Sequence, residues 1–235
     1  MDNYVILLAG GIGKRMGADV PKQFLEVKGK PIIVHTLEHF QKHEHIEKIL
    51  VVCVQGWREY VKRLVKEYNL SKVEWVIDGG DTGHDSISNG VFFLQDKIQL
   101  SDYIIIHDAV RPIINKKLID DLLFVAHNNG NASSSIACHP PIVYTDDLKS
   151  SIKDIDREHV MLTASPQAYN YSLALECYKK ARDEDKHDFT FTSSLLIYYG
   201  KRIYFAKGST LNIKVTEKED LDLFEALLNM QINTI

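Results

Sequence analysis

A glycine-rich segment near the start of the chain has the residues needed to hold a polyanion. Gly10, Gly11 and Gly13 follow an apolar run and let the backbone turn tightly against a ligand without interference from Cβ atoms. Successive backbone N–H groups in such a turn can bind phosphate oxygens, and Arg15 and Lys22 add two cations nearby. This combination favours a triphosphate over a neutral ligand. A turn without a ligand would explain the glycines but not the two cations.

The same segment differs from two common nucleotide-binding motifs. It lacks the Gly-Lys-Ser/Thr ending of a P-loop, which disfavours a Walker-type NTPase. A dinucleotide-binding turn requires a helix directly after the glycines and an acid near the end of the second strand. Pro21 interrupts the expected helix early, and the second apolar run ends in Val54-Gln55-Gly56, which contains no acid. A nicotinamide-dependent dehydrogenase is therefore an alternative that rests on the glycine pattern alone.

Two further charged residues could act with this segment. Asp108 directly follows an apolar run, where a carboxylate commonly binds Mg²⁺; capping a helix or pairing with Arg111 is the structural alternative. Lys214 lies between apolar neighbours in a strand-like stretch, where it could point at a transferring phosphoryl group or at solvent. His107 is interpreted as structural, because no second histidine lies at metal-ligand spacing.

These groups together suit nucleotidyl transfer. In that reaction the phosphate of an acceptor attacks the α-phosphorus of a nucleoside triphosphate and pyrophosphate leaves, which requires alignment and charge stabilisation more than a protein nucleophile. Arg15, Lys22 and Lys214 would neutralise negative charge, and Mg²⁺ on Asp108 would bridge phosphates. No general base is needed, because the acceptor phosphate is already an anion.

The pattern of apolar residues predicts an α/β fold with a mostly parallel sheet that has helices on both faces. A projecting β-hairpin is predicted from residues 142–145 and 151–155, and Asn115 is expected to cap a helix. Thr216-Glu217-Lys218-Glu219 fits a capping box before the last helix. Strands are predicted at residues 4–9, 48–54, 73–77, 103–106, 133–138 and 202–205, and helices after Pro31, at 57–68, around 87–94, and at 118–126, 171–182 and 221–230.

The polar clusters follow three of these predicted strands. Residues 10–22 follow the first strand, residues 79–86 the third and residues 107–112 the fourth. Ligands of open α/β sheets bind at the carboxyl ends of the strands. We therefore expect the three clusters to form one site.

Composition limits the classes of partner. The 235 residues are 45% hydrophobic and 26% charged with a net charge of −4, which gives no overall bias towards nucleic acid or an anionic membrane. No signal peptide and no apolar run long enough to cross a bilayer is apparent. The three cysteines are widely spaced in apolar contexts, as in a reducing compartment. We expect a cytoplasmic protein with one domain over residues 1–235 and no nucleic-acid or membrane partner.

The motifs also carry a resemblance to a known family. The stretch Leu8-Ala9-Gly10-Gly11-x-Gly13-x-Arg15-Met16-Gly17 with Pro21-Lys22-Gln23-Phe24 resembles the signature of the sugar-phosphate nucleotidylyltransferases, and within them the cytidylyltransferases that make CDP-methylerythritol or CDP-ribitol. The resemblance covers nearly the whole chain and implies a three-layer, Rossmann-like fold. Further matching motifs follow in order, at residues 79–90, 107–112, 165–167, 212–216 and 219–221.

The resemblance implies substrates and residue roles. CTP, Mg²⁺ and a phosphorylated polyol or sugar would bind, with Arg15, Lys22 and Lys214 catalytic and Asp108 the metal ligand. Residues 139–157 would form the family's dimerisation arm, so that Thr145 and Arg157 reach the acceptor phosphate across a homodimer while Arg111 also contacts the acceptor. The resemblance assigns CTP binding to Ala9, Gly10, Gly11, Gly13, Gly80, Asp81, Ser86 and Asp108.

The departures from the family pattern lie mainly on the acceptor side. Gly83-His84 stand where an arginine is usual, Tyr144-Thr145 replace an Asp-Thr pair, and Phe191-Thr192 replace acidic residues. Trp57 and the sequence Pro-Lys-Gln-Phe-Leu favour a pentitol phosphate such as ribitol 5-phosphate as the acceptor. Methylerythritol phosphate is the alternative acceptor. A nucleotide-binding subunit without catalysis is the alternative from another class.

Overall fold

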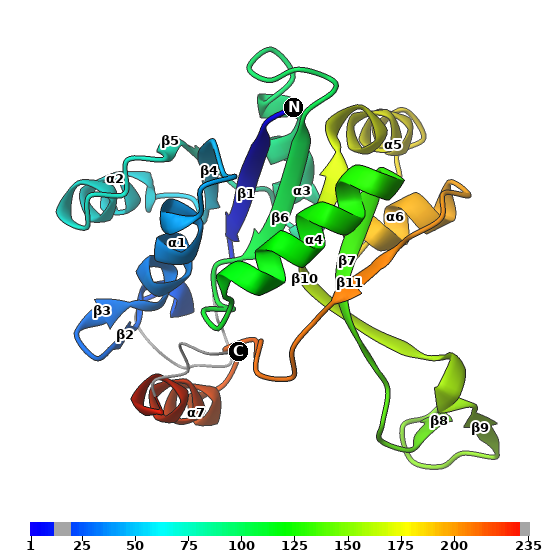
Figure 1. The fold of residues 1–235 in the computed structure, drawn as a ribbon. Coiled ribbons are helices and arrows are strands. Elements are labelled where there is room, and N and C mark those ends of the chain that lie inside the picture. The colour runs from blue at the N-terminus through cyan, green and yellow to red at the C-terminus, as the bar shows by residue number, and fades with distance from the viewer. Residues whose placement is uncertain (12–19, 231–235) are drawn as a thin grey trace.

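The structure, a computed structural model, describes residues 1–11 and 20–230 (Figure 1). Its main feature is a seven-stranded sheet in the order β11-β7-β10-β6-β1-β4-β5, in which β10 runs antiparallel to both neighbours and the other pairs are parallel. The prediction of a mostly parallel sheet is confirmed. The strands are β1 (Asn3–Ala9), β4 (Lys48–Cys53), β5 (Val73–Asp78), β6 (Tyr103–Asp108), β7 (Asn131–Ala137), β10 (Met161–Asn170) and β11 (Phe205–Lys207).

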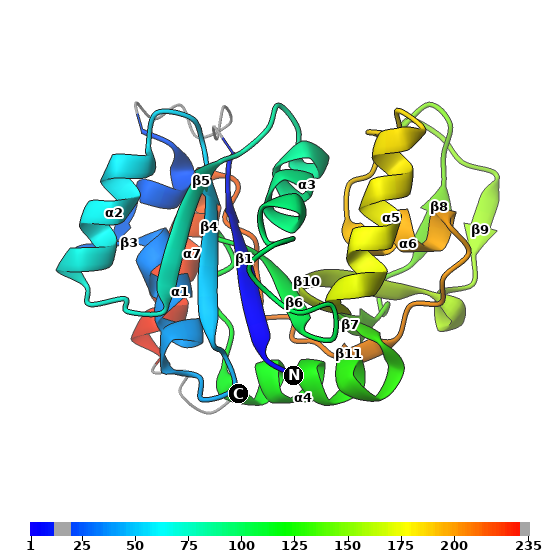
Figure 2. The same cartoon turned by 90° about the horizontal axis from the view of Figure 1, so that it is seen from above.

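Helices cover both faces of this sheet (Figure 2). One face carries α1 (Ile32–Lys42), α2 (Arg58–Glu67) and α4 (Lys116–Asn129). The other carries α3 (Gly83–Phe93), α5 (Tyr171–Asp183) and α6 (Thr192–Tyr198). Near α1, helix α7 (Lys218–Asn229) packs against a small hairpin of β2 (Glu26–Val27) and β3 (Lys30–Pro31), which follows the 3₁₀ turn η2 (Lys22–Phe24).

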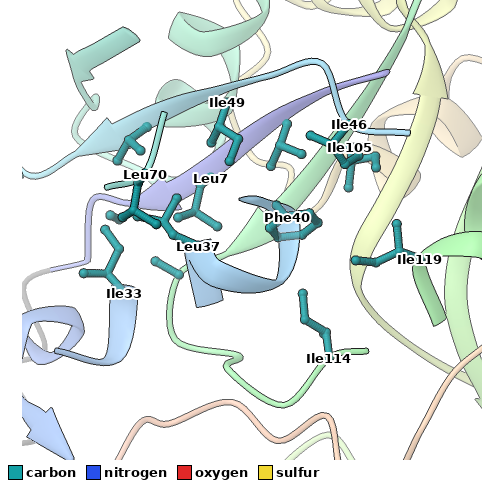
Figure 3. Close-up of a cluster of buried hydrophobic side chains, with 14 of the residues drawn as sticks. Leu7, Ile33, Leu37, Phe40, Ile46, Ile49, Leu70, Ile105, Ile114 and Ile119 are labelled. Atoms are coloured by element: carbon teal, nitrogen blue, oxygen red, sulfur yellow. The ribbon is translucent and has the colours of Figure 1, made fainter. Parts of the chain in front are cut away.

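The two layers explain why the central strands are apolar along their whole length. Side chains of β1 alternate between the faces, so that Val5 and Leu7 join the core under α1 while Ile6 joins the core under α3. All three side chains are fully buried. Figure 3 shows Leu37 and Phe40 of α1 packed in the first of these cores. This packing holds the carboxyl ends of the strands at one edge of the sheet.

Several local predictions were wrong in position. The strand predicted at 202–205 lies at β11, residues 205–207, and Lys214 lies in a segment that belongs to no helix or strand. The last helix is capped by Glu217 rather than Thr216, because the Asp220 carboxylate accepts the backbone N–H of Glu217 at 2.9 Å. The cap of α4 is as predicted, with Asn115 Oδ1 accepting the N–H of Leu118 at 2.8 Å.

One strand of the main sheet and one of its covering helices were not predicted, nor were the short β2, β3, η2 and η3. Strand β10 contains Pro166 and has a register shift between Ala164 and Gln167, so its sequence lacks regular alternation. Helix α6 has only seven residues, too few for a clear helical period.

The predicted hairpin is confirmed. Strands β8 (Ile142–Tyr144) and β9 (Lys153–Ile155) pair antiparallel and are followed by the 3₁₀ turn η3 (Arg157–His159). Figure 1 shows this arm projecting from the body of the molecule.

Candidate active site

A cavity of about 600 Å³ lies at the carboxyl ends of β1, β4, β5 and β6. The three polar clusters expected to meet do meet here, which confirms that prediction, and the segment that follows β11 joins them. The lining residues are Leu8, Ala9, Gly10, Gly11, Lys22, Gln23, Val54, Gln55, Gly79, Gly80, Asp81, Thr82, Gly83, Ser86, Asp108, Val110 and Lys214. A strand-end cavity with several glycines on its wall suits a ligand that approaches the backbone closely.

Two hydrogen bonds hold the segment of Lys22 and Gln23 at the cavity wall. Lys22 Nζ donates to the backbone oxygen of Val215 at 3.0 Å, which joins the first loop to the C-terminal segment. The neighbouring Gln23 is buried, and its Nε2 donates to the backbone oxygen of Ala9 at 2.6 Å. Two other residues predicted to lie in this loop, Gly13 and Arg15, fall outside the described residues.

Trp57, at the start of α2, supports the turn η2 that contains Lys22 and Phe24. Its ring stacks on Phe24 with centroids 4.8 Å apart, and Tyr60 packs edge-on against both rings. Stacked and edge-on aromatic pairs are favourable beyond their burial of apolar area. Trp57, which favoured a pentitol phosphate in the sequence, therefore anchors the 3₁₀ turn η2 and does not line the cavity.

The second loop is fixed by the start of α3. Thr82 caps the helix in a capping box with Asp85. Ser86 Oγ donates to the backbone oxygen of Thr82 at 2.9 Å and accepts the N–H of Gly80 at 3.1 Å. A Cβ atom on Gly79 would lie 2.7 Å from Ser86 Oγ, so another residue there would force Ser86 Oγ out of its present position. Helix N-termini provide unpaired N–H groups for an anionic or polar ligand.

The predicted nucleotide-binding residues Gly80, Asp81 and Ser86 all line the cavity. Thr82 and Gly83 line it too, although the sequence analysis assigned them no role. The pattern Thr82-x-x-Asp85 is a capping-box signature, which could have identified this helix start and its N–H groups.

Asp108 and Lys214 form the charged end of the cavity. Lys214 Nζ and Arg111 Nε each lie 3.2 Å from Asp108 Oδ2. Ser165 Oγ donates to the same oxygen at 3.2 Å and accepts the N–H of Asp108 at 3.1 Å. Burial by itself would raise the pKa of Asp108, but Lys214 and Arg111 outweigh it and hold that pKa below its usual value. The carboxylate is therefore ionised at neutral pH.

Asp108 is suited to hold a divalent cation. Mg²⁺ usually takes one or two carboxylates and completes its shell with water and substrate phosphates, which matches a single ionised carboxylate at a cavity wall. The alternative interpretation, pairing with Arg111, is also present. In residues 1–11 and 20–230, no three His, Cys, Asp or Glu side chains gather as a ready-made metal cage.

His107 is structural, as predicted. It is fully buried, its Nε2 lies 3.0 Å from the backbone oxygen of Arg111, and its ring meets Phe40 edge-on. Burial lowers the pKa of His107 to about 4. A neutral imidazole that supports the turn after β6 follows from these contacts.

The three residues assigned to the acceptor do not meet in the cavity of the single chain. Arg111 Nη1 donates to the backbone oxygen of Asn212 at 2.7 Å, and Arg111 lines a second cavity of about 150 Å³. Thr145 Oγ1 donates within the arm to the backbone oxygen of Ser150 at 2.6 Å. Arg157 donates to the backbone oxygen of His139 at the base of the arm.

Comparison with protein families shows which family has this sequence pattern. The family model described as 2-C-methyl-D-erythritol 4-phosphate cytidylyltransferase matches residues 3–230. The chain belongs to this family. Within it, a ribitol-5-phosphate cytidylyltransferase of Lacticaseibacillus paracasei is 40% identical over 225 residues, covering 95% of this chain and 96% of that protein. A 2-C-methyl-D-erythritol 4-phosphate cytidylyltransferase of Clostridium botulinum is 34% identical over 226 residues, covering 96% and 97%.

Solved structures of cytidylyltransferases share the fold. The structure titled 4-diphosphocytidyl-2C-methyl-D-erythritol synthase from Anaerococcus prevotii superposes with a TM-score of 0.82 over 97% of this chain and 98% of that chain, at 21% identity. The 2-C-methyl-D-erythritol 4-phosphate cytidylyltransferase of Francisella tularensis gives a TM-score of 0.80 at 23% identity, over 99% and 100% of the two chains. The predicted Rossmann-like fold is thereby confirmed. Among the described residues no helix is long and apolar enough to span a membrane.

Proposed function

We propose that this protein transfers a cytidylyl group from CTP to a phosphorylated polyol, with ribitol 5-phosphate or a related pentitol phosphate as the acceptor, and releases pyrophosphate. The observation that carries the proposal is the pairing of Lys214 with Asp108 at the end of a glycine-lined cavity that also holds Lys22. The 40% identity to a ribitol-5-phosphate cytidylyltransferase supports the choice of acceptor.

The residues of the cavity divide the work of binding. The backbone of Ala9, Gly10 and Gly11 is suited to the phosphates, together with Gly13 from outside the described residues. Gly80, Asp81 and Ser86 are suited to the nucleoside, because the loop they form is fixed at the N-terminus of α3. This division keeps the triphosphate next to the cations and the nucleoside near the helix N-terminus.

The cations then stabilise charge as the reaction proceeds. Lys22 and Lys214 lie at the cavity wall, and Arg15 is assigned the same role. Asp108 would hold Mg²⁺, which when bound neutralises phosphate charge and aligns the phosphates. The pairing of Lys214 with Asp108, the proposed metal ligand, supports a role for Lys214 at the α-phosphate. The acceptor phosphate attacks the α-phosphorus, the bond to the β-phosphate breaks, and pyrophosphate carries away the negative charge.

Methylerythritol 4-phosphate is the second candidate acceptor. The family match and the 34% identity to a Clostridium botulinum cytidylyltransferase named for that substrate favour it. Both acceptors would require the same CTP-binding residues. They differ in the carbon chain that carries the attacking phosphate.

We further propose that the arm over residues 139–157 pairs two copies of the chain. Its apolar side chains project into solvent: Val143 is 58% exposed, Leu148 90% and Ile152 fully exposed. A second copy would cover them and bring its Thr145 and Arg157 towards the acceptor. The buried cysteines are free thiols, which supports a reducing, cytoplasmic setting.

The test is pyrophosphate release with CTP and Mg²⁺ against ribitol 5-phosphate, methylerythritol 4-phosphate and other pentitol and pentose phosphates. We expect the largest kcat/KM with a pentitol phosphate and no release without Mg²⁺. A preference for methylerythritol 4-phosphate would select the second candidate. CTP binding by calorimetry with no turnover on any acceptor would instead support a non-catalytic nucleotide-binding subunit.

A further inference from the structure

Residues 184–191, the segment that links α5 to α6, are joined to the start of α3 by His187. The segment belongs to no helix or strand. His187 Nδ1 lies 3.2 Å from Asp85 Oδ1, and its Nε2 lies 3.1 Å from Asp185 Oδ1 in the same segment. Asp85 belongs to the capping box of α3. The histidine therefore ties the segment to the helix start that forms one wall of the cavity.

Asp85 supports the part of this wall that we assign to the nucleoside. Its Oδ2 accepts the backbone N–H and the hydroxyl of Thr82, at 3.2 Å and 2.7 Å. Gly80 lies directly against it, because a Cβ atom on Gly80 would come within 2.3 Å of Asp85 Cβ. Gly80 and Thr82 line the cavity, whereas Asp85 lies behind them and is not a lining residue. A contact that fixes the Asp85 carboxylate therefore also fixes this wall.

An aromatic cluster sets the position of His187 as well. His84, from the pair that stands where the family usually has an arginine, is buried and does not line the cavity. Its ring packs on Tyr178 of α5 and on Phe189 of the segment, with centroids 5.3 Å and 5.6 Å away. His187 meets the same ring edge-on at 5.9 Å. This packing holds the segment 184–191 next to α3.

His187 can make both of its bonds only when its ring is protonated. An ionised carboxylate only accepts hydrogen bonds, and a neutral imidazole has one N–H where the imidazolium has two. The ionisable groups that face His187 are Asp85 and His84 of α3 and Asp185 of its own segment. Asp185 and Asp85 raise the pKa of His187. Hydrogen bonds from Thr82 hold the pKa of Asp85 below its usual value, and burial lowers the pKa of His84. The pair is therefore a cation beside an ionised carboxylate.

We propose that His187 is a positioning residue for CTP, because its imidazolium holds Asp85 and thereby keeps Gly80 and Thr82 in the shape that accepts the nucleotide. The inference rests on the proposed function for the identity of that nucleotide. The positive charge of His187 also offsets the negative charge of Asp85 close to a site for a polyanion. CTP and the proton on His187 therefore strengthen each other's binding. This effect is complete while the ring is charged and is lost as the pH rises through its pKa.

The kinetic test compares two substitutions of His187 at two pH values. His187→Ala removes both bonds, whereas His187→Asn keeps an N–H donor near the position of Nδ1 but cannot titrate. At pH 6 we expect KM for CTP to rise about threefold to fivefold in His187→Ala, as for a partly exposed ion pair, and less than twofold in His187→Asn. The value of kcat should not change in either variant. At pH 9, where the wild-type ring is neutral, both variants should lie within twofold of the wild type.

His45 provides the matched control. Its exposed ring lies against the buried ring of His43 with centroids 5.7 Å apart, much as His187 lies against His84. His45 precedes β4, however, and so lies at the edge of the sheet opposite the cavity. His45→Ala should leave KM for CTP and kcat unchanged at both pH values. A KM for CTP in His187→Ala that stays within twofold of the wild type at pH 6, or that rises equally at pH 9, would overturn the inference while the proposed function stands.

An NMR titration of the wild-type protein makes the test independent of turnover and of how well the variants fold. Because coupling between two binding events is reciprocal, adding CTP and Mg²⁺ without an acceptor should raise the pKa of His187 and leave the titration of His45 unchanged. A His187 titration that CTP does not move, in protein that binds CTP by calorimetry, would overturn the inference. No binding of CTP by the wild type would instead refute the proposed function.

Discussion

Replacing Lys214 by methionine tests how much of the rate depends on one cation. Its Nζ lies 3.2 Å from Asp108 Oδ2, and its side chain is 37% exposed. Two unit charges 4 Å apart interact by about 1 kcal/mol in water and by about 4 kcal/mol at the effective dielectric constant of a protein surface. The interaction of the partly exposed Lys214 with a phosphate charge lies between these limits, so we take about 2.7 kcal/mol for it. Losing that transition-state stabilisation corresponds to a loss of about 100-fold in kcat/KM.

The same substitution should barely change folding. Arg111 and Ser165 remain bonded to Asp108, so its carboxylate keeps two of its three partners. The free energy of unfolding should fall by less than about 1 kcal/mol, as expected for a partly exposed ion pair. Thermal and urea unfolding of Lys214→Met check this, which separates loss of catalysis from loss of structure.

Lys201 provides the matched control. Its side chain is 35% exposed and its Nζ lies 3.4 Å from Glu176, which resembles the environment of Lys214 but lies outside the cavity. Pyrophosphate release by Lys201→Met should stay within about twofold of the wild type. The reasoning is refuted if Lys214→Met retains more than a third of the wild-type kcat/KM, or if the two variants lose activity equally.

Three further predictions concern the nucleotide loop, the histidine under Asp108 and the arm. In Gly80→Ala the new Cβ would collide with Asp85. The Kd for CTP from calorimetry and the KM for CTP from kinetics should therefore both rise more than tenfold, and unchanged values would refute the close approach of CTP to this loop. Burial lowers the pKa of His107 to about 4, while an unfolded histidine titrates near about 6.5. As the pH falls, the unfolded chain therefore binds the proton first. The contribution of neutral His107 to the free energy of unfolding is complete above about pH 6.5 and is lost towards pH 4. NMR titration should therefore find this ring neutral at pH 5.5, and a charged ring would contradict the assignment. Leu148→Lys with Ile152→Lys should convert the proposed dimer to a monomer in light scattering, and a wild-type monomer would remove the basis for the arm contact.

The sequence was sufficient for strands β1, β4 and β6 because they are buried on both faces. Continuous apolar runs such as the one ending at Ala9 are distinctive, and the glycines that follow it mark the strand end. The bulged strand β10 and the seven-residue α6 were missed because neither has a period that can be counted.

The orientation of individual site residues could not be predicted in the same way. Ser165 contacts Asp108 from 57 residues away, and no local pattern encodes that pairing. Arg111 satisfies both the predicted proximity to Asp108 and an unpredicted bond to Asn212. The roles of Thr145 and Arg157 stay predictions, because they require a second copy of the chain.

The position of the bond that breaks in CTP tests the central claim most directly. CTP labelled with ³²P at the α-phosphate or at the γ-phosphate is supplied with Mg²⁺ and ribitol 5-phosphate, and the products are separated. We predict that the α-label appears in the cytidylylated polyol and the γ-label in pyrophosphate. Transfer of the γ-label to the acceptor would show a kinase, and either that result or retention of both labels in CTP with every acceptor would contradict the account.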